Sequence, residues 1–157
     1  MLNLSRLDRN IIRELITDAR QPSLHIAKKV NATRQTIAKK ISKFVHSGII
    51  SGFTIKLNAA TFGLTIQAYI LIREGSAQTI RTYNESVIEK LPQVSRFHRL
   101  FGKYSGIIEA LVKDMDALTE LVKRLHGLQG ILETETLLIY NSPKDRIEDP
   151  FLNALSQ

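Results

Sequence analysis

The chain contains no cysteine and no tryptophan among its 157 residues. The lack of cysteine excludes disulfides, thiolate zinc sites and a cysteine nucleophile. No apolar run approaches the roughly 18 residues of a membrane-spanning helix, and the N-terminus is charged by Arg6, unlike a signal peptide. The four histidines, at positions 25, 46, 98 and 126, lack metal-ligand spacing. We therefore expect a folded cytoplasmic protein that uses no metal and no cofactor.

Acidic residues are scarce in one part of the chain. Residues 1–60 hold eleven Lys and Arg against three acids, a net charge of +8, whereas residues 61–157 hold eleven bases against twelve acids, a net charge of −1. The overall charge of +7 therefore belongs to the N-terminal segment. Positive charge concentrated on a compact unit favours a polyanionic partner, most often nucleic acid. The alternative is that the basic face is only exposed to water and binds no partner.

Three short helices are predicted between residues 5 and 47. Ser5 and Asp8 have the spacing of a capping box at the start of the first helix, and Pro22 ends the segment that follows it. Ser23 is expected to cap the second helix and Thr33 the third, which stops at Gly48. A short helix, a tight turn and a longer helix indicate a helix-turn-helix. The alternation after Gly48 predicts a strand over residues 53–57, which makes the unit winged-helix-like.

The third predicted helix has two different sides. Ile37, Ile41 and Phe44 fall on one side at 100° per residue, and the opposite side is basic and rich in hydrogen-bonding groups. Phosphates require Lys and Arg, while base edges require side chains that donate and accept hydrogen bonds. We expect Arg34, Gln35, Thr36 and Lys39 to read bases, Lys28, Lys29, Lys40 and Lys43 to contact phosphates, and Thr33 to join this set at the helix start.

The second half of the chain reads as strand, helix, strand, strand, helix, strand. This order predicts an α+β fold, in which a ferredoxin-like βαββαβ domain has both helices on one face of an antiparallel sheet. The run from Tyr69 to Ile72 suggests burial on both faces, and the uncovered face keeps apolar residues that need another subunit. The predicted strands are 64–72, 94–101, 105–112 and 133–140, and the predicted helices are 76–91 and the segment between Asp114 and Gly127.

We divide the chain into four parts on this basis. They are a DNA-binding domain over residues 1–57, a linker over 58–63, a ferredoxin-like dimerisation domain over 64–141 and a tail over 142–157. In the tail, Phe151, Leu152 and Leu155 are the residues expected to dock.

Short stretches in both halves resemble the Lrp/AsnC, or feast/famine, family of prokaryotic transcription regulators. No single stretch is decisive, but their order and spacing together are specific. They are Leu7-Asp8-Arg9 with Ile11-Ile12, Asp18-Ala19-Arg20, Thr33 to Ile37 with Lys40-Ile41, Gly48-Ile49-Ile50, Gly102-Lys103-Tyr104, Lys113 to Leu118, and Gly130-Ile131 with Thr134-Glu135-Thr136.

The resemblance implies a mode of action that composition does not show. Family members bind double-stranded DNA as homodimers, often assemble into octamers, and in many cases bind an amino acid or a related small effector between dimers. By resemblance, the effector would be lined by the turn after the second strand and by the fourth strand. The matching residues here are Leu100, Gly102, Lys103, Tyr104, Ser105, Thr134 and Thr136.

Three positions depart from the family pattern. Ser105 stands where many effector-binding relatives have an aspartate, and a serine offers only a neutral hydrogen bond to a ligand ammonium. Either the ligand lacks a free α-ammonium, or another residue holds it, or no effector binds. Lys40 occupies a common arginine position and lacks the bidentate fork, and Phe44-Val45 replaces a common Leu-Glu pair.

The sequence favours a sequence-specific DNA-binding transcriptional regulator and no enzymatic activity. A nucleoid-like architectural protein with little sequence preference is the alternative, because phosphate contacts alone give affinity without specificity. An enzymatic alternative, tetrapyrrole decarboxylation, would need a pocket of Arg and His. Arg96, His98 and Arg99 are its candidates, and strand alternation puts Arg99 on the other face from the first two.

Overall fold

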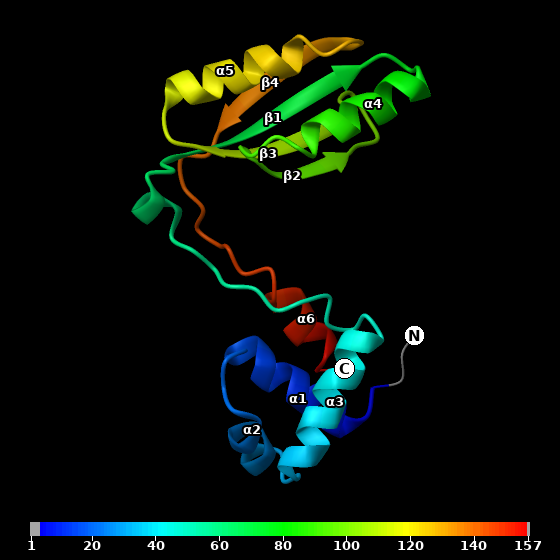
Figure 1. The fold of residues 1–157 in the computed structure, drawn as a ribbon, viewed down its shortest axis with the longest axis vertical. Helices are drawn as coiled ribbons and strands as arrows, with labels where there is room; N and C mark the ends of the chain where they lie inside the picture. Colours follow the sequence, from blue (N-terminus) through cyan, green and yellow to red (C-terminus); the bar gives the residue numbers. More distant parts are fainter. Residues whose placement is uncertain (1–3, 157) are drawn as a thin grey trace. The chain divides into compact units, whose positions relative to one another are not determined.

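The computed structural model describes residues 4–156, which form two compact units (Figure 1). The first unit contains residues 1–56 and 144–157, and the second contains residues 57–143. The first unit holds four helices, α1 (Arg6–Thr17), α2 (Ser23–Lys29), α3 (Arg34–His46) and α6 (Asp149–Ala154). The second holds the 3-10 helix η1 (Ala59–Phe62), the strands β1 (Ile66–Glu74), β2 (Val94–Arg99), β3 (Gly106–Val112) and β4 (Ile131–Leu138), and the helices α4 (Gln78–Ile88) and α5 (Met115–His126).

Local signals set the ends of the first three helices. The hydroxyl of Ser5 accepts the N–H of Asp8, and the Asp8 carboxylate accepts the N–H of Ser5, so the predicted capping box is confirmed. Thr33 caps α3 by accepting the N–H of Thr36 at 3.1 Å, also as predicted. The helices enclose a core that consists of Ile11, Leu15, Ile26, Ala27, Ile37 and Phe44. The predicted helix-turn-helix is therefore confirmed.

Two local predictions in this unit are wrong. Ser23 is the first residue of α2 rather than its cap, and Pro22 precedes it without a side-chain capping bond. Residues 53–57 form no strand. The alternation of that segment is real, but Phe53, Ile55 and Leu57 are all exposed. Within the described residues no neighbouring strand pairs with the segment, and a strand needs such a partner for its backbone N–H and C=O groups.

The second unit is a ferredoxin-like sheet with helices on one face, as predicted. The strand order is β2-β3-β1-β4, and every neighbouring pair is antiparallel. Alternate residues of β1 and β3 point into a core with α4 and α5, and Gly106 leaves room there for the ring of Phe97, which a Cβ would approach to 2.7 Å. The core residues are Ala68, Ile70, Ile72, Ile88, Leu91, Ile108, Ala110, Val112, Leu118, Leu121 and Leu125.

The opposite face of the sheet is not covered in the single chain. Tyr69 is 37% exposed, and Leu71 is half-buried. The prediction that both faces of β1 are buried is therefore wrong for one chain, since α4 and α5 pack on the same side. The predicted first strand also starts two residues too early, and the predicted first helix of this unit is too long at both ends. No helix in residues 4–156 is both long and apolar enough to cross a bilayer.

An ion pair joins α1 to α3 inside the first unit. The Asp8 carboxylate accepts hydrogen bonds from the Lys40 ammonium at 2.7 Å and from the Ser5 hydroxyl at 2.6 Å. Burial raises the pKa of Asp8, but the bonds from Lys40 and Ser5 outweigh burial and hold that pKa below its ordinary value. The Asp8 carboxyl group therefore binds its proton less tightly in the folded state than in the unfolded chain.

We predict that Asp8→Ala lowers the free energy of unfolding by about 1–3 kcal/mol near neutral pH, because it removes a cap and leaves Lys40 without its partner. The contribution of Asp8 is complete above the unfolded pKa of about 3.9 and disappears as the pH falls through the lower folded pKa. Urea unfolding at about pH 7 and about pH 3 measures this, with the exposed Asp18→Ala as control. A difference between the parent and Asp8→Ala that is the same at both pH values would contradict the prediction.

Candidate DNA-binding and effector sites

The buried side of α3 determines which residues it presents to solvent. Ile37 is fully buried, Phe44 is 2% exposed, and Ile41 is half-buried. The packing of these side chains fixes the rotation of α3 about its axis. The opposite side is exposed, and its residues are Gln35, Lys39, Ser42, Lys43 and His46. The predicted division of α3 into a core side and a basic side is therefore confirmed.

The basic residues proposed for DNA contact divide into two groups. Lys28, Arg34, Lys39 and Lys43 are exposed, and among residues 4–156 they have no ion-pair partner. Lys29 instead pairs with Glu14 at 2.5 Å, and Lys40 pairs with Asp8 at 2.7 Å. The Lys29 side chain is 55% exposed and can exchange this partner for a phosphate at little cost. The Lys40 side chain is 29% exposed and held by Asp8, so it is less available to a phosphate than Lys29 is.

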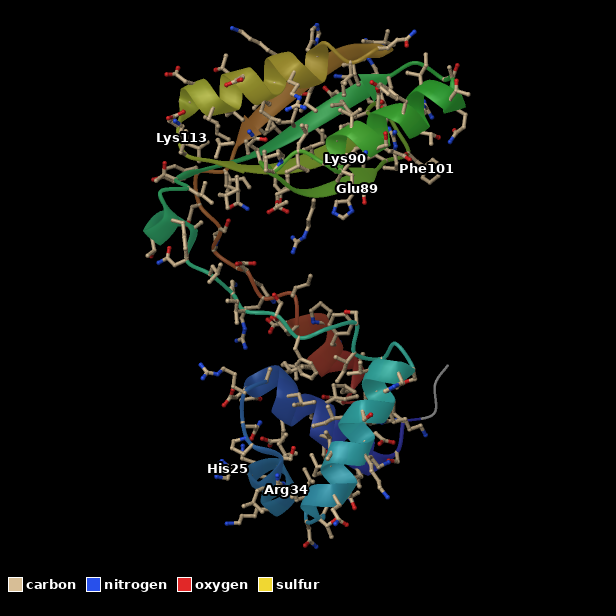
Figure 2. The ribbon with its side chains drawn as sticks, viewed as in Figure 1. His25, Arg34, Glu89, Lys90, Phe101 and Lys113 are labelled. Atoms are coloured by element: carbon tan, nitrogen blue, oxygen red, sulfur yellow. The ribbon has the colours of Figure 1, made fainter. Side chains whose placement is uncertain are left out.

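The start of α3 combines several features that suit a DNA backbone or a base edge. The hydroxyls of Thr33 and Thr36 are 2.9 Å apart and are both used in the cap. Arg34 and Gln35 follow the cap and are exposed, and no acidic residue lies in the first turn. Free backbone N–H groups at a helix start attract anions. Figure 2 shows Arg34 at the end of the unit where α2 and α3 meet, with His25 nearby on α2.

The predicted effector residues cluster at one end of the sheet. The turn between β2 and β3 is closed by the bond from the Leu100 N–H to the Ser105 carbonyl at 3.0 Å, and Gly102 takes a φ of 140° that disfavours other residues. Ser105 precedes Gly106, which lies opposite Ile72 of β1, and Ile72 lies opposite Thr134 of β4. Thr136 lies one pleat further along, opposite Ile70.

The hydroxyl of Ser105 is engaged within the sheet. It donates to the carbonyl of Ile72 at 3.1 Å and accepts the N–H of Glu74 at 3.0 Å. The Ser105 N–H also donates to the Ile72 carbonyl, at 2.9 Å. This residue therefore joins the turn to the end of β1, and its donor hydrogen is not available to a ligand.

The neighbouring Tyr104 and Lys103 make contacts that the sequence does not indicate. The Tyr104 hydroxyl donates to the Glu135 carboxylate of β4, and the Lys103 ammonium lies 4.8 Å from the centre of the Tyr104 ring. The neighbouring Tyr104 and the negative charge of Glu133 raise the pKa of Lys103. The sequence does not single out Glu135 as an effector residue. A charged residue between Thr134 and Thr136 is what any strand with one exposed face shows. The Glu135 carboxylate is the one that bonds to Tyr104 of the turn, and Glu133 also lies near enough to act on Lys103.

A buried polar network lies behind the turn. The Glu74 side chain is fully buried and bonds to Arg99 and to the Asn84 amide, the latter at 2.8 Å. Asn84 also donates to the carbonyl of Gln129 at 3.0 Å, and Arg99 reaches Glu85 at 2.6 Å. Burial lowers the pKa of Arg99, but the bonds to Glu85 and Glu74 outweigh it and raise that pKa. The network joins β1, β2, α4 and the segment before β4.

The three candidates for an enzymatic pocket are not brought together. Arg96 pairs with Glu109 at 3.2 Å on the uncovered face of the sheet, whereas Arg99 points to the helix side. His98 is exposed. In the part of the chain that the structure describes, no group of three His, Asp or Glu residues could hold a metal ion.

Comparison with known families matches both units. Residues 4–44 match the AsnC-type helix-turn-helix domain, and residues 67–148 match the Lrp/AsnC ligand binding domain. The chain is also similar to an HTH-type transcriptional regulator of Pyrococcus horikoshii. The two are 31% identical over 144 residues, which covers 92% of this chain and 96% of the relative.

Solved structures of similar proteins have the same fold. AsnC of Escherichia coli is 28% identical, with a TM-score of 0.83 over 92% of this chain and 97% of that chain. A transcriptional regulator of Neisseria meningitidis, solved as a complex with L-methionine, is 19% identical, with a TM-score of 0.90 over 97% of this chain and 99% of that chain. At that identity the second likeness shows the fold alone.

Proposed function

Because the chain belongs to the Lrp/AsnC family of transcriptional regulators, we propose that it binds specific DNA sequences through α3 and is regulated by an amino acid. Its role is gene regulation through a helix-turn-helix domain and a ligand-binding domain, which is not an enzymatic role. The observation that carries the DNA-binding proposal is the division of α3 into a side buried by Ile37 and Phe44 and a side that exposes cations. DNA is the partner, so we place its action in the cytoplasm.

The proposed contacts follow the arrangement of free and paired side chains. Arg34, Gln35 and Lys39 are assigned to base edges, because they lie in the first turns of α3 and are exposed. Lys28 and Lys43 are assigned to phosphates, with Lys29 joining them once it leaves Glu14. Thr33 and Thr36 contribute by holding the helix start, and Lys40 by holding α3 on α1.

A double charge reversal tests the DNA-binding surface. We predict that Lys39→Glu with Lys43→Glu weakens binding to a promoter fragment by at least about tenfold and flattens the salt dependence, by about 0.9 in slope for each phosphate that the protein no longer neutralises. Fluorescence anisotropy over a range of salt concentrations measures both quantities. The matched control is Lys90→Glu with Lys113→Glu, two exposed lysines of the sheet unit (Figure 2). Equal affinities for the two double variants would contradict the assignment.

An architectural role with little sequence preference is the remaining alternative. This alternative predicts nearly equal dissociation constants for a promoter fragment and for bulk DNA at the same salt concentration. A sequence-specific regulator instead binds its own site about a thousandfold or more tightly than bulk DNA. Gln35 supports the specific role, because its amide can both donate to and accept from an adenine edge.

We also propose that the uncovered face of the sheet pairs with that of a second copy. The face carries Tyr69 and Leu137 side by side in the β1–β4 register, and Leu71 and Ile107 side by side in the β1–β3 register. All four are partly or substantially exposed in the single chain, and a second copy would bury them. A dimer also presents two α3 helices to one duplex, at half-sites about 34–36 Å or a multiple of that apart. Assembly of dimers into an octamer is a further proposal.

We predict that Leu137→Glu converts the protein to a monomer of 17.7 kDa, because it places a charge in the proposed interface. Leu137 is 46% exposed, so the substitution costs the single chain little. Met115→Glu is the control, since Met115 is 51% exposed at the start of α5, away from this face. Light scattering after gel filtration gives the masses. A parent protein that is monomeric, or a dimer unaffected by Leu137→Glu, would refute the interface.

The proposed effector is an amino acid bound near the β2–β3 turn. Two observations support this site, namely the match of residues 67–148 to a ligand-binding domain and the gathering of Tyr104, Ser105 and Thr134 at one end of the sheet. The similar protein of Neisseria meningitidis was solved with L-methionine. Because Ser105 is engaged with β1, we assign the ligand ammonium to Glu135.

A thermal-shift screen of the amino acids, beginning with L-methionine, tests the effector proposal. A ligand at about 100 times its dissociation constant adds about 2.7 kcal/mol to the folded state and raises the melting temperature by several degrees. We predict that Glu135→Gln removes most of the shift, whereas the exposed Glu120→Gln on α5 retains it. No shift with any amino acid would refute the effector. An unchanged shift in Glu135→Gln would refute the assignment of the ammonium.

A further inference from the structure

The end of the chain returns to the helical unit at its beginning. Residues 144–157 belong to the same compact unit as residues 1–56, although the whole sheet unit lies between them in the sequence. The short helix α6 lies beside α1 (Figure 1), and Leu152 and Leu155 are half-buried. Phe151, the third residue expected to dock, is 62% exposed. Two of the three residues expected to dock are therefore partly shielded from solvent, and Phe151 is not.

One arginine of α1 holds the end of α6. The Arg13 guanidinium donates to the carbonyl of Leu155 at 2.7 Å and to the hydroxyl of Ser156 at 3.1 Å. The Ser156 hydroxyl in turn donates to the carbonyl of Leu152 at 2.9 Å. The last carbonyls of a helix have no partner within it, so a positively charged donor at this place stabilises the helix end.

A second set of contacts holds the segment that leads into α6. Lys56, at the end of the segment after α3, pairs with the Asp145 carboxylate at 2.6 Å and donates to the Asp145 carbonyl at 2.9 Å. Asp149 pairs with Lys144 at 2.9 Å and with Arg146 at 3.4 Å. A six-residue helix is not stable in isolation. α6 therefore depends mainly on its contact with α1 for its structure, because the side chains of these ion pairs are largely exposed and contribute little.

We infer that residues 144–156 are an integral clasp of the DNA-binding unit, held on α1 by Arg13 as the positioning residue. This basic side chain is thereby assigned to the stability of the unit rather than to DNA. Figure 1 shows α6 at the opposite end of the unit from α2, so the clasp leaves the region of α2 and the start of α3 uncovered. It stiffens α1 and does not compete with DNA.

The clasp also gives the DNA-binding unit a second covalent connection to the sheet. β4 ends at Leu138 and α6 begins at Asp149, so ten residues join the strand that carries Thr134 and Glu135 to the helix on α1. A change in β4 on ligand binding therefore reaches α1 through this segment as well as through residues 47–63. This consequence rests on the effector function proposed above, whereas the clasp itself does not.

The clasp is tested by a double-variant cycle that starts from the full chain, in the absence of DNA and ligand. The variants are Arg13→Ala, a chain that ends at Pro143, and the combination of the two, with Arg6→Ala as the matched control on α1. Arg6 is exposed and, among the described residues, has no hydrogen-bond or ion-pair partner. The readouts are hydrogen exchange of the α1 amides and thermal unfolding, which do not depend on the proposed function.

We predict that Arg13→Ala and the truncation each speed α1 exchange by about fivefold or more and lower the melting temperature of the helical unit by about 4–8 °C. In the truncated chain Arg13→Ala should add little, since its partners are already absent. Arg6→Ala should match the parent. Unchanged α1 exchange after truncation, or an equally large effect of Arg13→Ala in the truncated chain, would overturn the clasp.

The affinity for DNA provides a separate check on the role of the clasp. The truncated chain should bind a promoter fragment within about threefold of the parent, because α6 lies away from the proposed groove-facing surface. A gain of more than about tenfold on truncation would mean that the segment obstructs DNA, and the clasp would then be an inhibitory element. Failure of the parent to bind any DNA would refute the proposed function and leave the exchange result intact.

Discussion

The rotation of α3 about its own axis is the constraint on which the DNA-binding role depends. Ile37 and Phe44 are seven residues apart, almost two turns, and therefore lie on one side of the helix. Both are buried against α1 and α2, so the opposite side must face solvent. The Asp8–Lys40 pair adds a polar link between α1 and α3 beside this apolar contact. If the core allowed α3 to rotate, Arg34, Gln35 and Lys39 would have no defined direction.

In the sheet unit, α4 and α5 cover one face of the sheet, and the other face is left exposed in the single chain. α4 and α5 bury alternate residues of β1 and β3, and the intervening residues form an uncovered surface that mixes apolar side chains with ion pairs. Behind the β2–β3 turn, the Ser105 hydroxyl, the Glu74 carboxylate, the Arg99 guanidinium and the amide N–H groups of Asn84 form hydrogen bonds within the protein. The carboxylate that we propose for the ligand ammonium, Glu135, comes from the neighbouring strand β4.

The clasp connects the helix that supports α3 to the chain that leaves the sheet. Arg13 lies on α1, whose inner side packs against α3, and it holds the segment that follows β4. The helical unit is thus built from both ends of the described chain, and the sheet unit is inserted between them. An insertion of this kind leaves two segments through which the state of the sheet unit can affect α1.

The sequence by itself determined the first three helices of the helical unit, the helix-turn-helix, the order of strands and helices in the sheet unit, and the family resemblance, but it did not indicate α6. Caps such as Ser5 and Thr33 and the stripe of Ile37 and Phe44 are local, because partners within eight residues meet whenever a helix forms. The strand predicted at residues 53–57 failed for the complementary reason, since a strand needs a partner that local pattern does not supply.

The tertiary structure alone decided which polar groups meet. Asp8 and Lys40 are 32 residues apart, Ser105 and Glu74 are 31 apart, and Arg13 and Leu155 are 142 apart. Each of these groups has several chemically suitable partners in the sequence. Which partner it finds depends on how helices and strands pack, because packing sets the distances across which a hydrogen bond or an ion pair can form.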